Sequence, residues 1–250
     1  MITVCIANNK GGVGKTTTTI NLGAALADAG KRVLLVDLDP QASLTKSLGI
    51  DTAEWGDGAY NLFMGQPGKV EIVLLDIGRA GNHLSVIPTS NSLSLIPKEL
   101  IDHINPNGVL RKALGPVTGR YDVVLLDTPP NLDRLTINAL VASNYVIIPC
   151  QCQIMALLGL KDFSATLAKV QGVNERLEVL AVLPTMFTAN RKVEQEALSI
   201  LQNSYGELCR PPLPNRVEYL KASAEQRPVA GELALYWQEL AEYVTGKAAL

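Results

Sequence analysis

The sequence predicts an α/β fold, in which a mostly parallel, twisted sheet carries helices on both faces. Short apolar segments alternate along the chain with longer segments whose apolar residues recur at helical spacing. Such alternation is typical of parallel strands joined by helices that cross over the sheet. Three of the predicted strands are followed by polar residues, and ligands in such sheets bind at the carboxyl ends of the strands.

The first predicted strand and the first predicted helix enclose a glycine-rich loop. Residues 2–7 form a short apolar run expected as a buried strand, and residues 16–28 have helical spacing that ends at Gly30. Residues 10–17 between them read KGGVGKTT. Strand, glycine loop and helix form a phosphate site, because the helix N-terminus directs free N–H groups toward an anion. This order disfavours the alternative of a glycine-rich turn with two solvated lysines.

The loop departs from the common phosphate-binding pattern, Gly-x-x-x-x-Gly-Lys-Thr, at its start. Asn9 stands where that pattern has its first glycine, and Lys10 adds a second lysine to the Lys15 of the pattern. The glycines of the loop permit close approach of the backbone to an anion. Lys10 therefore stands where it could reach a phosphate on a neighbouring molecule.

The remaining predicted elements continue the alternation. Strands are expected at residues 31–37, 84–88, 121–127, 144–149 and 177–184. Helices are expected at residues 93–104, 108–115, 154–170, 191–205 and 229–244. Residues 51–70 are rich in glycine and proline and are expected to be loop.

Acidic residues follow two of these strands. Asp37 and Asp39 follow the second strand in the sequence DLDPQ, and Asp127 follows a later strand in the sequence DTPP. The apolar residues before Asp127 are typical of a Walker B acid, which holds Mg²⁺ directly or through water. A single such acid could be only a helix cap or turn former. Two acidic strand ends together with a phosphate loop favour a site for a nucleotide and Mg²⁺.

The composition is that of an ordinary globular protein. The chain has 250 residues, of which 47% are hydrophobic and 18% charged, enough for one large core. We expect residues 1–250 to form a single domain, with no helix-turn-helix domain before the first strand. The net charge of −2 gives no overall attraction to nucleic acid, so any DNA contact must use a local basic patch.

The sequence shows no targeting segment and no apolar run long enough to cross a bilayer, which favours a cytoplasmic protein. In a reducing compartment the cysteines are expected to be free thiols. His83 and His103 lack the spacing of a metal site. The four cysteines are Cys5, Cys150, Cys152 and Cys209.

Three motifs together resemble the deviant Walker-box ATPases, and among them the ParA/Soj group that positions plasmids, chromosome origins and protein cargoes. They are KGGVGKTT, VLLVDLDPQ at residues 33–41 and DVVLLDTPP at residues 122–130. Less specific matches follow at residues 146–151, 156–160, 183–187 and 213–217, so the resemblance covers nearly the whole chain.

The resemblance implies a P-loop fold that binds ATP and Mg²⁺. Lys15 is implied to bind β- and γ-phosphate oxygens, the Thr16 hydroxyl to ligate Mg²⁺, and Thr17 to hold the α-phosphate. Asp37 and Asp127 are implied to lie at the metal. The other implied nucleotide contacts are Gly11, Gly12, Val13 and Gly14 in the loop, and Thr185, Met186, Pro214 and Asn215 around the adenine.

The resemblance also implies a slow ATPase that works as a homodimer. Asp39 matches the acid that positions the attacking water and lies at the metal. Lys10 matches a lysine that crosses the dimer interface and supplies positive charge to the partner's transferring phosphoryl group, as an arginine finger does. Hydrolysis would release the segments 39–48 and 128–131, which the γ-phosphate holds.

The ATP-bound dimers of this group bind DNA without sequence preference, associate with the nucleoid, and hydrolyse ATP faster with a small ParB-like or adaptor protein. Basic side chains that face phosphates are needed for such binding. Residues 187–227 contain six basic and five acidic residues, so a solvated helix face is the alternative for each candidate. The group often has PRNVR where residues 214–218 read PNRVE. The candidates are Arg191, Lys192, Arg216, Lys221 and Arg227.

Three related functions are alternatives. A MinD-like membrane ATPase would need a basic amphipathic C-terminal helix, but the last predicted helix carries Glu232, Glu239 and Glu242. An iron–sulfur carrier would need paired cysteines, and packing is the role that we expect for Cys150 and Cys152. An ATP-dependent small-molecule amidoligase would need a metabolite for turnover.

Overall fold

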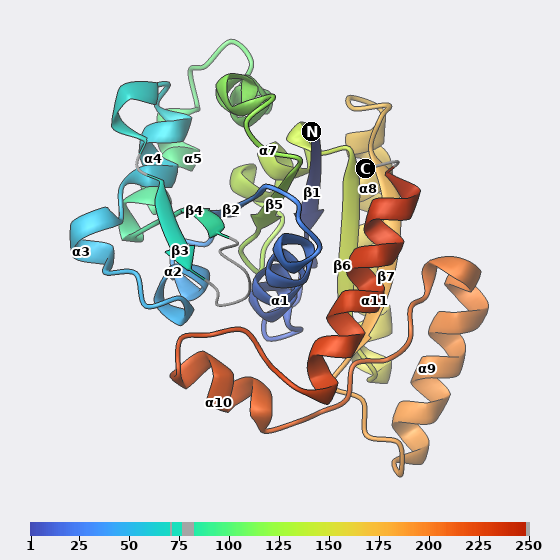
Figure 1. Cartoon of the computed structure of the whole chain (residues 1–250). Coiled ribbons are helices and arrows are strands. Elements are labelled where there is room, and N and C mark those ends of the chain that lie inside the picture. The colour runs from blue at the N-terminus through green and yellow to red at the C-terminus, as the bar shows by residue number, and fades with distance from the viewer. Residues whose placement is uncertain (71, 77–82, 249–250) are drawn as a thin grey trace.

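A seven-stranded sheet runs through the middle of the described part of the molecule (Figure 1). The computed structural model describes residues 1–70, 72–76 and 83–248. Neighbouring strands are parallel except for one antiparallel edge pair, β3 and β4, which confirms the predicted mostly parallel sheet. In spatial order the strands are β3 (Val73–Asp76), β4 (His83–Ile87), β2 (Val33–Asp37), β5 (Val123–Asp127), β1 (Ile2–Ile6), β6 (Tyr145–Gln151) and β7 (Glu178–Thr185).

Helices cover both faces of the sheet, as predicted. In β1, Val4 and Ile6 pack into the core beneath α1 (Lys15–Asp28) and α11 (Glu232–Lys247). Cys5 lies between them and packs into the opposite core, beneath α7 (Arg134–Ala142) and α8 (Ile154–Gln171). Successive residues of a strand point to opposite faces, so a strand buried on both faces is apolar throughout. Figure 1 shows α1 and α11 side by side in front of the sheet.

Seven further helices of the described residues surround this framework. None of the described helices is long and apolar enough to pass through a membrane. The helices around the framework are α2 (Ser43–Ser47), α3 (Thr52–Trp55), α4 (Gly58–Phe63), α5 (Ile96–Glu99), α6 (Val109–Ala113), α9 (Lys192–Tyr205) and α10 (Glu218–Ala224).

The prediction that residues 51–70 are loop is wrong, because α3 and α4 lie there. Asp51 caps α3 through a hydrogen bond that its carboxylate accepts from the Ala53 N–H at 2.8 Å. Leu62 and Phe63 at the end of α4 are buried in the core. Capping and the burial of two large side chains outweigh the low helix propensity of the surrounding glycines.

The predicted helix at residues 93–104 is much shorter in the structure. A 3₁₀ turn spans Asn91–Leu95, and α5 ends at Glu99. Pro97 lies in the first turn of α5, where proline is tolerated, and it disfavours a continuous helix from Leu93 because proline offers no N–H. Ile101 and Ile104 are exposed, so an extended helix would have no apolar face to bury there.

The sheet order brings the three polar strand ends together. β1 pairs with β5, and β5 pairs with β2, so the loop after β1 lies beside both acidic segments. Asp127 is aligned with Ile6 on one side and with Asp37 on the other. Parallel strands end at the same edge of a sheet, so segments far apart in sequence form one site there.

Candidate nucleotide site

The phosphate loop has the backbone geometry of an anion site. Gly14 precedes α1 in a left-handed conformation, with φ 92° and ψ 23°, and Gly12 has φ 69°. These positions favour glycine because other residues rarely adopt a positive φ. Gly14 has no side chain to cap the start of α1, and no capping hydrogen bond is found there among the described residues. The first N–H groups of α1 and the positive end of its dipole therefore remain available to a phosphate.

Lys15 lies inside this loop. Its side chain is largely buried, and its ammonium donates a hydrogen bond to the Lys10 carbonyl at 3.0 Å. Burial lowers the pKa of Lys15, and the nearby carboxylates of Asp127 and Asp39 partly oppose that shift. The loop backbone thus holds the ammonium, two acids lie in its vicinity, and a phosphate can replace the carbonyl as its partner.

Asp127 is fully buried at the base of the site. Its carboxylate accepts hydrogen bonds from the Thr16 hydroxyl at 2.7 Å and from the Thr19 hydroxyl at 3.3 Å. Burial and, second to it, the adjacent Asp37 carboxylate raise the pKa of Asp127 to about 8. Two carboxyl groups on neighbouring strands disfavour each other's ionisation in the absence of a cation.

Asp37 connects the site to α2. Its carboxylate accepts hydrogen bonds from the N–H and the hydroxyl of Thr45, at 2.9 and 2.7 Å, and from the Asp39 N–H at 3.1 Å. Burial raises the pKa of Asp37 to about 6, although these hydrogen bonds oppose the shift. Asp39 is only half-buried, and its carboxylate accepts the Gln41 N–H at 3.0 Å. Asp39 therefore lies at the rim of the site and Asp37 at its base.

The oxygen ligands at the base fit Mg²⁺. The Thr16 hydroxyl and the Asp127 carboxylate are hard ligands already in contact, and a divalent cation would relieve the unfavourable pairing of two buried carboxylates. No cluster of three or more His, Cys, Asp or Glu side chains suited to a metal occurs among the described residues. Mg²⁺ needs none, because it is usually held by one or two carboxylates, substrate phosphates and water.

We expect the binding of ADP with Mg²⁺ to release a proton and to tighten as pH rises from about 6 to 8. Burial and the adjacent Asp37 carboxylate raise the pKa of Asp127, so its carboxyl binds a proton more tightly than a free carboxyl does, and Mg²⁺ must displace that proton. Calorimetric titrations in two buffers of different ionisation enthalpy measure the release. ADP without Mg²⁺ is the control and should release less. Equal proton release with and without Mg²⁺ would contradict this assignment.

Lys10 lies at the outer end of the loop. Its backbone N–H donates to the Asn8 side-chain oxygen at 3.1 Å, and its side chain is half-buried. Its ammonium lies near Cys150 at the end of β6 and partly opposes the effect of burial, which raises the pKa of that thiol to about 11. Cys150 and Cys152 are both buried, in line with a packing role. Lys10 thus flanks the loop that holds Lys15.

The four residues expected around the adenine lie near the ends of β6 and β7. Thr185 is buried, and its hydroxyl donates to the Val13 carbonyl at 2.9 Å. Met186 is 40% exposed and has a positive φ of 55°. Phe187 pairs with residues 213–215, because its N–H donates to the Leu213 carbonyl and its carbonyl accepts the Asn215 N–H. This pairing brings Met186 close to residues 214–215.

Sequence reasoning gave no role to two polar residues that support this site. Gln151, the last residue of β6, donates from its side-chain amide to the Gly12 carbonyl at 3.1 Å. Thr45 donates to Asp37, and its hydroxyl also accepts the Thr89 N–H at 3.1 Å. Gln151 is a polar residue at the end of an otherwise buried strand, and this position in the sequence was a signal of a role at the site. The sequence around Thr45 gave no such signal, because a single threonine outside a motif is common on the surface of a protein.

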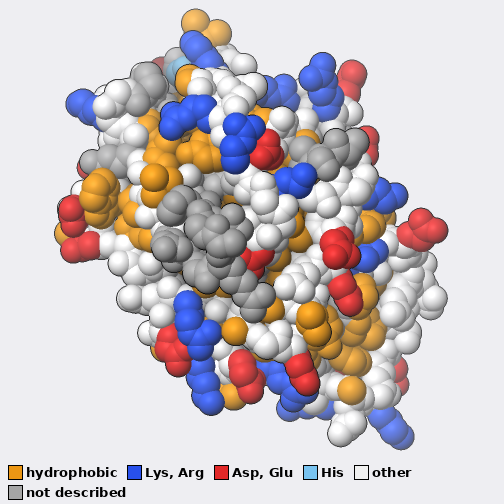
Figure 2. Space-filling view, viewed as in Figure 1, with side chains coloured by type: hydrophobic (Ala, Val, Ile, Leu, Met, Phe, Trp, Pro, Cys, Tyr) orange, Lys and Arg blue, Asp and Glu red, His pale blue; other side chains and the backbone are white. Residues whose placement is uncertain are grey.

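The five basic candidates for DNA contacts differ in their surroundings. Arg191 pairs with Glu194 at 3.0 Å, and Arg227 pairs with Glu225. Lys192, Arg216 and Lys221 are exposed, and no ion pair involves them within the described residues. Figure 2 shows Lys and Arg side chains interspersed with acidic ones, so no continuous basic block covers this face.

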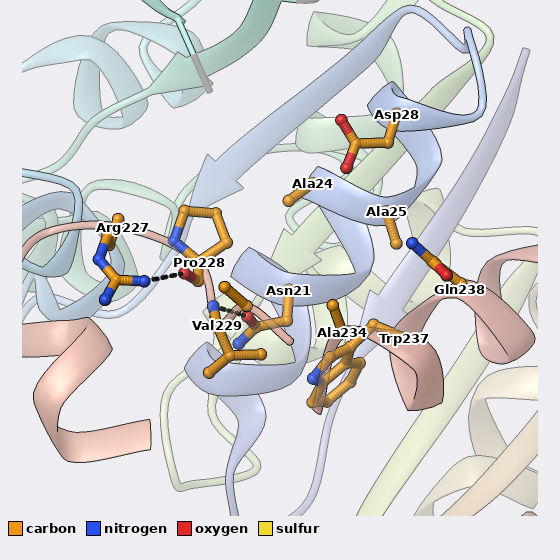
Figure 3. A pocket seen from close by; sticks show the side chains of 11 residues that line it. Asn21, Ala24, Ala25, Asp28, Arg227, Pro228, Val229, Ala234, Trp237 and Gln238 are labelled. Carbon is orange, nitrogen blue, oxygen red and sulfur yellow. Dashed lines mark hydrogen bonds between the residues drawn. The ribbon is translucent and has the colours of Figure 1, made fainter. Parts of the chain in front are cut away.

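A separate cavity of about 230 Å³ lies between α1 and α11 (Figure 3). The Asn21 side-chain oxygen accepts the Val229 N–H there at 2.8 Å, which ties the segment before α11 to α1. Its lining contains no residue of the phosphate loop and none of the three acids. The cavity is therefore distinct from the candidate nucleotide site.

The chain is similar to known proteins over most of its length. A family model described as an AAA domain matches residues 1–179. The sporulation initiation inhibitor protein Soj of Bacillus subtilis is 37% identical over 228 residues, which cover 90% of this chain and 89% of Soj. The chromosome partitioning protein ParA of Caulobacter vibrioides is 36% identical over 230 residues, which cover 90% of this chain and 85% of ParA.

The fold is similar to that of a solved nucleotide complex. Cobyrinic acid a,c-diamide synthase from Mycobacterium smegmatis, with a bound ATP analogue and magnesium, matches with a TM-score of 0.85 and 31% identity. The match covers 100% of this chain and 97% of that one.

Proposed function

The chain belongs to the ParA/Soj family of partition ATPases, and on this premise we propose that ATP joins two copies into a dimer that binds DNA without sequence preference. The observation that carries the proposal is the position of Lys10. Lys10 is a second, half-buried lysine at the start of the loop, and Lys15 already supplies the ammonium inside the loop. A second lysine at the rim suits a phosphate on another subunit, where it offsets the charge of the transferring phosphoryl group.

In this mechanism each subunit binds its own nucleotide and completes the other's site. Lys15 and the N–H groups of the loop hold the phosphates, and Thr16 and Asp127 hold Mg²⁺. Asp39 orients the attacking water from the rim of the site. Mg²⁺, when bound, neutralises charge on the phosphate oxygens.

Hydrolysis is coupled to the segment that contains α2. Asp37 at the base of the site accepts two hydrogen bonds from Thr45 of α2. Ala42, just before α2, has a positive φ of 57°, a strained conformation for a residue other than glycine. We propose that loss of the γ-phosphate releases this segment, that the dimer then separates, and that a small ParB-like or adaptor protein accelerates the step.

We expect the protein to retain DNA with a non-hydrolysable ATP analogue and Mg²⁺, but not with ADP. Retention should weaken steeply with salt, with a slope of log K against log [salt] of about −3 to −4 if a dimer contacts about four phosphates. A filter-binding titration over a series of salt concentrations measures the slope. Absence of DNA retention at low salt with the analogue would contradict the proposal.

A double variant of the two exposed candidates on and next to α10 locates this surface. Arg216→Ala with Lys221→Ala should reduce the salt slope and the affinity while dimerisation is unchanged, since both side chains are exposed and neither is among the residues assigned to the nucleotide. Arg191→Ala is the matched control, because that guanidinium is already paired with Glu194. An equal loss from the control would argue against a surface centred on α10.

One comparison favours a second candidate function. The Mycobacterium smegmatis protein is by its name a diamide synthase, and it matches this chain throughout. Turnover distinguishes an amidoligase from a partition ATPase. ATP hydrolysis that DNA stimulates without any added metabolite supports the partition function, and hydrolysis that requires a carboxylic acid substrate and an amide donor supports the amidoligase.

A further inference from the structure

We propose that Gln151 and Thr185 are positioning residues that hold two consecutive peptide groups of the phosphate loop in the orientation that binds phosphate. The inference deepens the proposed function and rests on residues 10–17 being its nucleotide site. The two residues are aligned in the pairing of β6 with β7, each at the end of its strand. Together they form a polar end to two neighbouring strands, directed at the loop.

Each side chain donates a hydrogen bond to a different carbonyl of the loop. The Gln151 amide donates to Gly12 at 3.1 Å, and the Thr185 hydroxyl donates to Val13 at 2.9 Å. Thr185 and Val13 are both buried. Water therefore has little access to the Val13 carbonyl, so loss of the Thr185 hydroxyl would leave this acceptor unsatisfied.

The geometry of the peptide bond makes these contacts relevant to phosphate. In a trans peptide group the carbonyl and the next residue's N–H point in opposite directions. The described chain has no cis peptide bond. Drawing the Gly12 and Val13 carbonyls toward β6 and β7 therefore turns the N–H groups of Val13 and Gly14 to the other side. Successive N–H groups turned to one side form a concave anion site.

The loop needs such external support because Val13 lies between two glycines with positive φ. Gly12 and Gly14 are conformationally permissive, so the loop would otherwise sample orientations in which its N–H groups diverge. Strand β6 also fixes the start of the loop. The Asn8 amide donates to the Pro149 carbonyl of β6 at 2.7 Å, and its oxygen accepts the Lys10 N–H.

This role differs from the adenine contact that the family resemblance implied for Thr185. The hydroxyl is engaged by the loop, and its methyl group is also turned to the loop, 3.7 Å from the position that a Cβ on Gly14 would occupy. A positioning residue for phosphates should affect every nucleoside diphosphate alike. An adenine contact should affect only ligands that carry adenine.

The test uses Thr185→Val, which keeps the shape of the side chain and removes its hydroxyl. We expect the Kd of both ADP and inosine diphosphate, each with Mg²⁺, to rise about tenfold, with their ratio unchanged. Thr185→Ser keeps the donor and should bind both ligands within about twofold of the wild type. Thr166→Val, which removes a hydroxyl that donates within α8, is the matched control and should change neither Kd.

Thermal unfolding with and without nucleotide establishes that each variant is folded. Unchanged affinity in folded Thr185→Val would overturn the proposal, as would weaker ADP binding with inosine diphosphate unaffected. A wild type that binds ADP but does not dimerise with ATP would contradict the proposed function and leave this inference intact.

A second variant tests the paired action of the two residues. Gln151→Met keeps the approximate length of the side chain and removes its donor without adding a charge, so it should also weaken both diphosphates about tenfold. Because both residues fix neighbouring peptide groups, we expect the double variant to be weakened by less than the product of the single effects. Independent, fully multiplicative effects would contradict a shared role in orienting the loop.

Discussion

Replacing Lys10 by alanine should abolish ATP-dependent dimerisation and lower the rate of ATP hydrolysis by about a thousandfold or more, the range found for charges supplied in trans. Lys10 flanks the loop, and its backbone carbonyl, which accepts the Lys15 ammonium, remains in the variant. Binding of ADP should therefore be nearly unchanged. Sedimentation with a non-hydrolysable ATP analogue measures the dimer, and phosphate release measures hydrolysis.

Lys169→Ala is the matched control for the loss of one lysine. Lys169 is exposed in the last turn of α8, at the end of that helix farther from the phosphate loop, so this variant should dimerise and hydrolyse ATP as the wild type does. Hydrolysis by Lys10→Ala at the wild-type rate would show that the lysine has no role across the interface.

Replacing Asp39 by alanine should trap the ATP-bound dimer. We expect hydrolysis to fall by at least about a hundredfold, because a group that positions or activates the attacking water contributes on that scale. Dimerisation should persist with ATP itself, since Lys10, Lys15 and Asp127 remain in place. Sedimentation after hours of incubation with ATP should show a dimer for the variant, while the wild type returns to the monomer as ATP is consumed.

Asp39→Asn separates the carboxylate's chemistry from its structural role. The Asp39 oxygen accepts the Gln41 N–H, and asparagine can preserve that hydrogen bond without the charge. We expect this variant also to be trapped as a dimer. Wild-type turnover by Asp39→Asn would mean that the turn, and not the carboxylate, matters for hydrolysis.

The sequence predicted the central strands because each is buried on both faces and therefore apolar throughout. The prediction of helices failed where contacts between distant segments decide the local structure. Helix α4 forms in a glycine-rich segment because Leu62 and Phe63 are buried in the core. The local sequence does not show that these two side chains will be buried. The helix expected after Leu93 is short because Ile101 and Ile104 are exposed, which depends on what lies opposite them.

The grouping of side chains at the carboxyl edge was predictable where the motif residues come directly after strands. Lys15, Thr16 and Asp127 lie together at the carboxyl edge, as their motifs indicated. Thr185 shows the limit of such reasoning, because a motif gives a position and not the direction of a hydroxyl. The pairing of β6 with β7 aligns Thr185 and Gln151, and their hydrogen bonds show that they point at consecutive carbonyls of the phosphate loop.

The central claim is that Lys10 of one subunit completes the ATP site of another, and mixing two inactive variants tests it most directly. A Lys10→Ala subunit keeps its own Asp39, and an Asp39→Ala partner can supply the missing Lys10. Their heterodimer therefore contains one complete site. We predict phosphate release from the mixture well above the sum of the separate proteins. Activity no higher than that sum, while labelled Lys10→Ala protein co-sediments with the Asp39→Ala protein, would contradict the account.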